Sequence, residues 1–276
     1  MKAVSDAMGV SRSNLYERDK KPKAVRRGYY HKSQDEELLP HILELVHQRP
    51  TYGYRRIHSL LNRRRKAQGR RLVNHKRIYR IMKQNNLLLS RCTAKRSECR
   101  HDGVVITLRP NMRWCSDEFE LACWNGEKVH VAFSLDCCDR EVMSHVATTA
   151  GINSEMIRDL MLQTVEYRFG QDDKVPQPIE WLSDNGSCYT ARDTRAFAKS
   201  LGLVCCTTPV SSPQSNGMAE AFVKTFKRDY VYVHDCPNAM TVMALLHEWF
   251  EDYNEIHPHQ GLKMKSPREF IRSYST

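Results

Sequence analysis

The order of strands and helices after residue 113 is the feature that most constrains this chain. Alternating or continuous apolar residues predict five strands, over 113–123, 128–138, 141–150, 179–184 and 203–209. Apolar residues at helical spacing predict three helices, over 154–170, 191–202 and 218–231. Asn125-Gly126 is a hairpin signal between the first two strands, and Asn153 or Ser154 caps the first helix. The pattern predicts an α/β fold in which three antiparallel strands precede alternating helices and strands.

That order is typical of a ribonuclease-H-like fold, a mixed five-stranded sheet with flanking helices. We assign residues 114–276 to this core, together with a helical C-terminal tail. Residues 91–113 lack clear periodicity and hold several Arg and Lys, so we interpret them as a basic linker.

Residues 35–90 are predicted to form a separate all-helical, helix-turn-helix-like DNA-binding domain. Pro50 and Gly53 end its first helix, and Asn74 is the predicted N-cap of its last. Its inward residues are Leu38, Leu39, Ile42, Leu45, Val46, Ile57, Leu60, Leu61, Ile78, Ile81 and Met82. The outward face of the last helix is basic, which suits DNA contact, and an ordinary solvated face is the alternative. Its members are Lys76, Arg77, Tyr79, Arg80 and Lys83.

Residues 1–30 contain what we interpret as a partial helix-turn-helix segment. Gly9 fits the turn, and Ser11 fits the N-cap of the helix that follows. The preceding helix would need more residues than stand before it, so we expect a shortened start or support from another chain. A frayed basic tail is the alternative.

Charge is divided unequally along the chain. Residues 1–113 carry 28 Lys and Arg against 9 Asp and Glu, whereas residues 114–276 carry 15 against 23. A basic front is typical of phosphate binding, and the acidic remainder is where metal ligands are expected. The ten cysteines, with no signal peptide and no apolar run of membrane length, predict reduced thiols and a cytoplasmic protein without membrane attachment.

Three acidic residues stand where such a fold could direct them at one point. Asp117 lies mid-strand on the face of Cys115 and Phe119, where a carboxylate costs free energy unless it binds something. Asp184 follows the end of a strand, and Glu220 lies in the first turn of a helix. Carboxylates in such a cluster are suited to hold two divalent cations about 3.5–4 Å apart for phosphodiester chemistry.

Asp184 and Glu220 also have ordinary structural interpretations, whereas Asp117 is the hardest of the three to explain in this way. Asp184 before Asn185-Gly186 is common turn chemistry, and Glu220 with Lys224 could be a plain helical ion pair. Four further acids are not counted as ligands: Glu118, Glu120, Asp136 and Asp139. We expect the last two to shape the turn around Cys137-Cys138.

The helix that carries Glu220 has two different faces. Phe222, Phe226 and Tyr230 recur every four residues and are expected to be buried. Lys224 and Lys227 follow Glu220 at four and seven residues, on a different stripe. This stripe places two candidate DNA-binding lysines beside one metal-binding acid.

The motifs together resemble a known family. TYGYRRIHSLL and VNHKRIYRIM precede a core that contains RWCSDEFE, SDNGSCY, SPQSNGMAEAFVKTFKRDY and YNEIHPHQGLKMKSPREF. Thirty-five residues separate Asp184 from Glu220, and a basic residue follows the glutamate by seven. The chain is similar to the second-reading-frame (OrfB) transposases of the insertion-sequence-three family of bacterial insertion sequences, whose core is related to retroviral integrases.

The resemblance implies Asp117, Asp184 and Glu220 as ligands of Mg²⁺, with Mn²⁺ as a substitute, and DNA strand cleavage and joining as the reaction. It implies no nucleotide cofactor. Its implied partners are insertion-sequence ends and target DNA, further copies of the chain on DNA, and a first-reading-frame protein or fusion, in a bacterial cell. Arg55 and Arg56, in the first of these motifs, join the candidate DNA contacts.

Two other functions stay open at this point. A DNA-binding regulator could keep the core as a scaffold, but the three acids favour catalysis. A simple metal-dependent nuclease would cleave without joining, but the long helical front favours a transposase. No GxxxxGK[ST] phosphate loop occurs, which argues against an ATPase.

Overall fold

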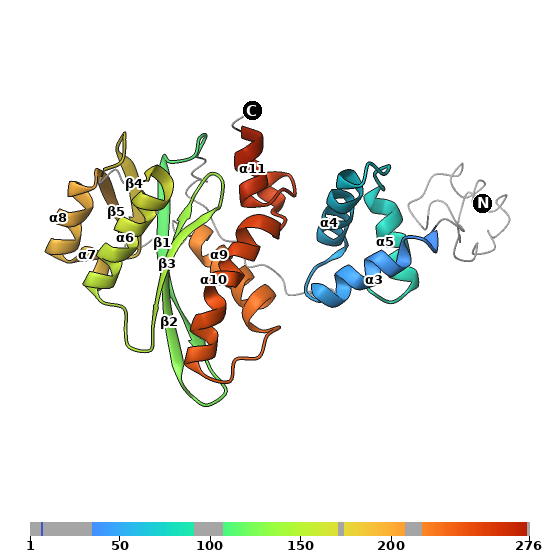
Figure 1. Cartoon of the computed structure of the whole chain (residues 1–276), viewed down its shortest axis with the longest axis horizontal. Coiled ribbons are helices and arrows are strands. Elements are labelled where there is room, and N and C mark those ends of the chain that lie inside the picture. The colour runs from blue at the N-terminus through green and yellow to red at the C-terminus, as the bar shows by residue number, and fades with distance from the viewer. Residues whose placement is uncertain (1–6, 8–34, 91–106, 171–173, 208–216, 275–276) are drawn as a thin grey trace.

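The computed structural model describes residue 7 and residues 35–90, 107–170, 174–207 and 217–274. A group of three helices precedes an α/β group that contains the sheet (Figure 1). The partial helix-turn-helix segment predicted over 1–30 lies outside the described residues, apart from Ala7, and so does most of the predicted basic linker.

The first group comprises α3 (Leu39–Gln48), α4 (Tyr54–Ala67) and α5 (His75–Gln84). The predicted inward residues form its core, with Leu39 and Val46 partly buried at the margin. Asn74 caps α5, because its side chain accepts a hydrogen bond of 2.8 Å from the Lys76 backbone N–H. The helix pattern of the sequence is therefore confirmed here.

The sheet consists of β1 (Arg113–Ala122), β2 (Lys128–Asp136), β3 (Val142–Thr148), β4 (Ile179–Ser183) and β5 (Leu203–Thr207). Its strand order is β3-β2-β1-β4-β5. The first three strands along the chain pair antiparallel, whereas β4 lies parallel to both β1 and β5. This is the mixed five-stranded sheet that the sequence predicts.

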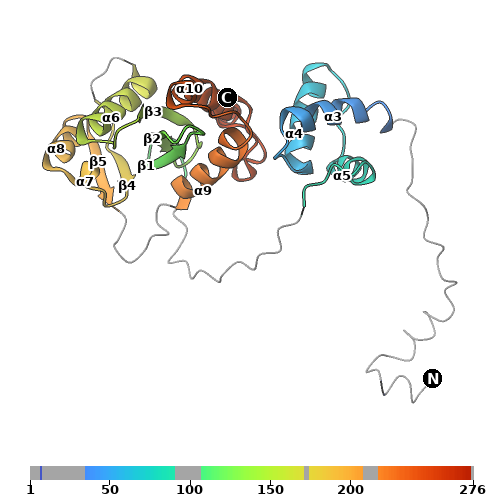
Figure 2. The ribbon, with the colours of Figure 1, turned by 90° about the horizontal axis from the view of Figure 1, so that it is seen from below.

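Helices cover both faces of the sheet (Figure 2). On one face α6 (Ser154–Phe169) and α8 (Arg192–Ser200) bury an apolar cluster, with the short α7 (Ser187–Thr190) beside them. On the other, α9 (Gly217–Phe226) and α10 (Ala239–Ile256) bury a second cluster. The tail closes with a 3₁₀ turn (Gln260–Leu262) and α11 (Pro267–Tyr274). None of the described helices is long and apolar enough to cross a membrane.

The helix predicted over 218–231 is not a regular α-helix throughout. The α-helical geometry ends at Phe226, and a π-helix, η3 (Lys227–Val231), continues the chain in the same run. The wider turn is closed by a 2.9 Å hydrogen bond from the Tyr232 N–H to the Lys227 carbonyl. Asp229 and Tyr230 are both buried within it, so the π-helix brings a carboxylate inward beside the aromatic stripe.

The turn around Cys137-Cys138 is built as expected. Both N–H groups that follow Cys137 donate to the buried Asp136 carboxylate, at 2.7 Å from Cys138 and 3.1 Å from Asp139. Arg168 pairs with Asp139 at 2.8 Å. Burial raises the pKa of Asp139 to about 7, with the Asp136 charge adding to the effect. These two acids therefore have structural roles.

Candidate active site

Asp117 stands near the middle of β1, half-buried between two buried neighbours on its face, Cys115 and Phe119. Glu118 and Glu120 point to the opposite, exposed side, as strand alternation requires. The Glu118 backbone N–H donates to Asp117 Oδ1 at 2.9 Å. The strand thus holds one carboxylate on an otherwise apolar face.

Asp184 is the first residue after β4, and its side chain is exposed. Because β4 pairs parallel with β1 in a register that joins Cys115 to Leu182, the two strands lead Asp117 and Asp184 towards the same edge. The Gly186 N–H donates to Asp184 Oδ1 at 3.0 Å, a local turn that holds the carboxylate just beyond the sheet.

Glu220 lies in the first turn of α9 and is exposed. Phe222 and Phe226 fix the helix on the sheet, with ring centroids 4.5 Å from Phe133 and 5.7 Å from Phe119, respectively. Lys224 Nζ lies 3.5 Å from Glu220 Oε2. This exposed helical pair contributes about 0.5 kcal/mol at most, so it does not explain the acid's position.

Electrostatics links the three acids. Burial, together with the negative charges of Asp184 and Glu220, raises the pKa of Asp117 to about 6. Within the described residues, however, no three acidic, His or Cys side chains lie close enough together to hold a metal ion. The three carboxylates therefore influence one another through their charges, although they are not close enough together to coordinate one metal ion. Carboxylate oxygens are hard donors that suit a divalent cation, and a bound cation would offset the repulsion between the three acids.

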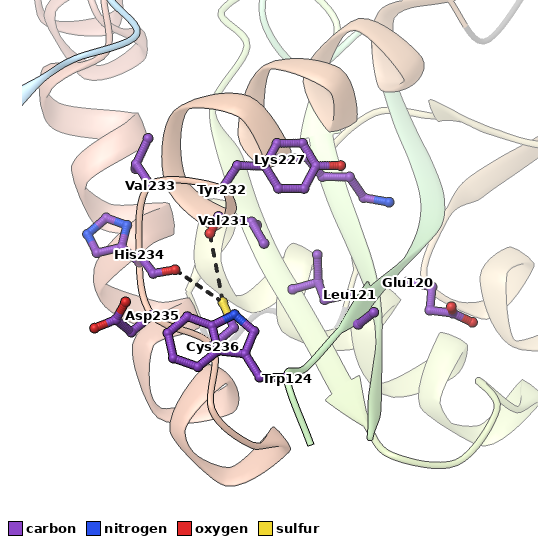
Figure 3. Close-up of a pocket in the computed structure, with 11 residues that line it drawn as sticks. Glu120, Leu121, Trp124, Lys227, Val231, Tyr232, Val233, His234, Asp235 and Cys236 are labelled. Atoms are coloured by element: carbon purple, nitrogen blue, oxygen red, sulfur yellow. Dashed lines mark hydrogen bonds between the residues drawn. The ribbon is translucent and has the colours of Figure 1, made fainter. Parts of the chain in front are cut away.

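A hollow of about 580 Å³ lies beside η3, the π-helical continuation of α9 (Figure 3). Lys227 lines it together with the exposed rings of Trp124 and Tyr232. Lys227 Nζ also lies 5.7 Å from the centroid of the Phe119 ring. The described lining includes none of the three acids.

In the helical domain, two of the predicted DNA-contact residues, Arg77 and Arg80, form ion pairs within the protein. The guanidinium groups of Arg77 and Arg80 both bind the buried carboxylate of Asp35, the former at 2.6 Å. These hydrogen bonds and charges keep the pKa of Asp35 below its ordinary value, against the opposing effect of burial. Lys76 and Lys83 are exposed on the same helix.

The remaining candidates on α4 and α5 differ in setting. The Tyr79 ring packs edge-on against Tyr54, with centroids 5.0 Å apart. Arg55 is exposed and donates to the Tyr54 hydroxyl at 3.1 Å. Arg56 is instead bound to the buried Asp229 at 2.8 Å, so its guanidinium is directed at the core.

Family models match nearly all of the described chain. A model described as an HTH-like domain matches residues 33–96, and two described as an integrase core domain match residues 107–213 and 202–267. The chain is 50% identical over 242 residues to the transposase InsD for insertion element IS2A/D/F/H/I/K of Escherichia coli, covering 87% of this chain and 80% of the relative. The chain belongs to the insertion-sequence-three family of transposases.

A solved structure supports the fold of this transposase. A simian T-cell lymphotropic virus intasome, solved in complex with PP2A regulatory subunit B56 gamma, matches with a TM-score of 0.52 at 18% identity. That match covers 72% of this chain and 66% of the viral chain. The predicted integrase-like ribonuclease H fold is confirmed.

Gly186 provides a test of how the transposase positions Asp184. A Cβ atom at Gly186 would lie 3.0 Å from Asp184 Oδ1, whereas its backbone φ of −56° suits any residue. We expect Gly186→Ala to fold normally but to need several-fold more Mg²⁺ for half-maximal DNA cleavage, because the carboxylate is displaced. Gly151→Ala is the matched control, since nothing lies within 4 Å of its added Cβ. Equal Mg²⁺ requirements in the two variants would contradict the role of Gly186.

Proposed function

We propose that this transposase cleaves and joins DNA strands with Asp117, Asp184 and Glu220 as ligands of Mg²⁺, or of Mn²⁺ in its place. The observation that carries the proposal is the parallel pairing of β4 with β1, whose register leads Asp184 and the half-buried Asp117 to the same edge of the sheet. The charges of Asp184 and Glu220 also contribute to the raised pKa of Asp117. The three carboxylates come from β1, the end of β4 and the first turn of α9, and a bound cation would offset the repulsion between them.

Two in-line reactions at phosphorus account for transposition. In the first, a water oxygen bonds to phosphorus and the P–O3′ bond breaks, which leaves a 3′-hydroxyl on the element. In the second, that hydroxyl bonds to a target phosphorus and displaces the target's own O3′. One phosphodiester replaces another in the second step, so no nucleotide is consumed. Bound divalent cations supply charge neutralisation and activation of the attacking oxygen.

The chain's own residues position the DNA for these steps. Lys224 and Lys227 stand on the helix of Glu220, where their charges suit the backbone flanking the reacting phosphate. Lys76, Tyr79, Lys83 and Arg55 are the proposed contacts of the helical domain. We assign Arg77 and Arg80 a supporting role, as ion-pair partners of Asp35.

We further propose that several copies act together on paired element ends, with the product of the first reading frame as a partner or fused segment. The partner DNA is supported by the match to an HTH-like domain.

A duplex that carries an element end, mixed with a labelled target, gives one readout for each alternative function. The proposal expects Mg²⁺-dependent cleavage and joined product; cleavage without joining indicates a nuclease, and binding without cleavage a regulator.

Lys227 has a separate expected effect. Its contact with the Phe119 ring contributes about 0.5–1 kcal/mol at a partly exposed site, so Lys227→Ala should barely alter the free energy of unfolding. We expect strand-transfer yield to fall by about tenfold or more, because a positioned charge near the reacting phosphate is lost. Lys227→Arg should recover much of the yield. Lys199→Ala, an exposed lysine of α8 on the opposite face of the sheet, is the control. A large loss of stability in Lys227→Ala would assign the residue a structural role instead.

A further inference from the structure

A row of polar side chains connects the helical domain to the C-terminal part of the core. We define the α4 row as the five residues that recur every three or four positions from the α3–α4 turn along α4: Arg49, Tyr52, Arg56, Ser59 and Arg63. Each of them makes a polar contact with η3, with α10 or with the tail that follows α10. We call this set of contacts the joint.

Two ion pairs anchor the joint. Arg49 binds Asp252 of α10 through both terminal nitrogens, one of them at 2.8 Å from Oδ2. Arg56 Nη1 binds Asp229 Oδ2 at 2.8 Å, and Asp229 is 4% exposed. Arg228 also binds Asp229 at 2.7 Å. A buried carboxylate of this kind is tolerated only because it is paired, and its partners must therefore keep their geometry.

A hydrogen bond between two buried side chains and a third ion pair add direction to the joint. The Tyr52 hydroxyl lies 2.8 Å from His257 Nδ1, and both side chains are buried. Arg63 binds Glu269 of α11 at 2.6 Å and donates to the carbonyl of Ile256 at 2.7 Å. The same tail, from His257 onwards, belongs to a sequence motif for which the catalytic chemistry above has no role. In this structure the tail binds side chains of the α4 row.

Packed side chains and paired charges connect α5, through α4 and the joint, to the run of α9 and η3. On one side, Ile57 and Leu61 of α4 share a buried core with Ile78 and Met82 of α5. On the other side, Asp229 belongs to η3, which continues directly from α9. The Arg56–Asp229 pair therefore connects the domain that carries the exposed basic face to the end of the helix that carries Glu220.

We propose that the α4 row sets the position of α5 relative to α9 during end cleavage, and that Arg56 and Asp229 are positioning residues. Arg56 was a candidate DNA contact from its sequence motif, but its guanidinium binds a buried core carboxylate. The inference rests on the proposed function for its cleavage readout, and it extends that function by stating what holds a bound element end over the acids. Displacement of about 1 Å can slow a reaction by about 10²-fold.

Adjacent arginines on α4 provide a matched test. Each phosphate contact contributes about 0.9 to the slope of log K against log salt concentration. We expect Arg56→Ala to leave this slope and the affinity for an element end unchanged, while the cleavage rate at saturating DNA falls at least tenfold. Arg55→Ala should lower the slope by about 0.9. Arg56→Lys should restore most of the rate, because one N–H contact to Asp229 suffices.

Two outcomes would overturn the proposal. A slope lowered by about 0.9 in Arg56→Ala would show that Arg56 leaves Asp229 and binds phosphate. An unchanged cleavage rate would show that the joint does not position the end. If Arg56→Ala does not fold, Asp252→Asn replaces it, since this change removes the charge that Arg49 binds and keeps an acceptor for the Tyr230 hydroxyl.

A stability measurement tests the joint independently of catalysis. The urea midpoints of wild type, Arg56→Ala, Asp229→Asn and the double variant form a cycle. We expect the Asp229→Asn change to shift the midpoint less in the Arg56→Ala background than alone, and strict additivity would contradict the joint. If wild type showed no cleavage with Mg²⁺ or Mn²⁺ while the cycle showed coupling, the proposed function would fail and the joint would stand.

Discussion

Asp117→Asn should lower the rate of Mg²⁺-dependent DNA cleavage by about 10³-fold or more, with little change in affinity for an element end. The substitution keeps the shape of the side chain but removes one charge from the set that would hold the cation. Loss of that site removes several kcal/mol of transition-state stabilisation, and each 1.36 kcal/mol is about tenfold in rate. Affinity should persist because most of the positive charge lies in residues 1–113. A single-turnover assay with a labelled element end measures both quantities.

Glu118→Gln is the matched control for this prediction. Glu118 is the next residue of the same strand, but it is exposed on the opposite side and lies 3.1 Å from His130. It should retain cleavage close to wild type. Full cleavage by Asp117→Asn would remove Asp117 from the site, and equal losses in both variants would indicate a general effect of charge on the sheet.

Wild type and Asp117→Asn should also differ in how their stability depends on pH. The folded pKa of Asp117, about 6, lies above its ordinary value of 3.8, so the charged form is disfavoured in the folded state. The resulting cost appears as pH rises from about 4 to about 6 and is fully present above that range. Without metal, Asp117→Asn should therefore unfold at higher temperature than wild type at pH 7, with the difference vanishing below about pH 4. Added Mg²⁺ should stabilise wild type and not the variant.

Much of the fold followed from local patterns in the sequence. The alternation of Asp117 with Cys115 and Phe119 on β1, and the capping of α5 by Asn74, are local consequences of strand and helix geometry. The mixed sheet was also expected, because a hairpin signal joins the first two strands, whereas parallel strands require a crossover connection such as a helix. These features depend on residues close together in the chain, so a single sequence suffices to predict them.

The pairings between distant charges could not be predicted in the same way. Asp35 meets Arg77 and Arg80, and Arg56 meets Asp229, only once the domains have folded. An arginine on an amphipathic helix has the same local pattern whether it faces DNA or a buried carboxylate. The π-helix was missed for a related reason, since the four-residue repeat of Phe222, Phe226 and Tyr230 also fits a regular α-helix.

Phe226→Ala should lower the free energy of unfolding by about 3–5 kcal/mol, the range for removing a buried phenyl ring. Phe226 is fully buried at the centre of the aromatic cluster between α9, α10 and the sheet. Its ring centroid lies 4.6 Å from that of Phe250 and 5.2 Å from that of Tyr230. Urea unfolding measures the loss. Phe226→Leu should cost much less, because it leaves a smaller cavity.

The functional part of this prediction concerns Glu220. Because Phe226 and Phe222 hold α9 on the sheet, the cavity in Phe226→Ala should loosen the helix and raise the Mg²⁺ concentration needed for half-maximal cleavage. The comparison is made at a temperature where the variant is fully folded. Phe169→Ala is the control, since Phe169 stacks on Trp114 with centroids 6.2 Å apart in the cluster of the opposite face. That variant should lose stability and keep its Mg²⁺ requirement. If both variants changed in stability alone, α9 would not depend on the aromatic cluster for the position of its glutamate.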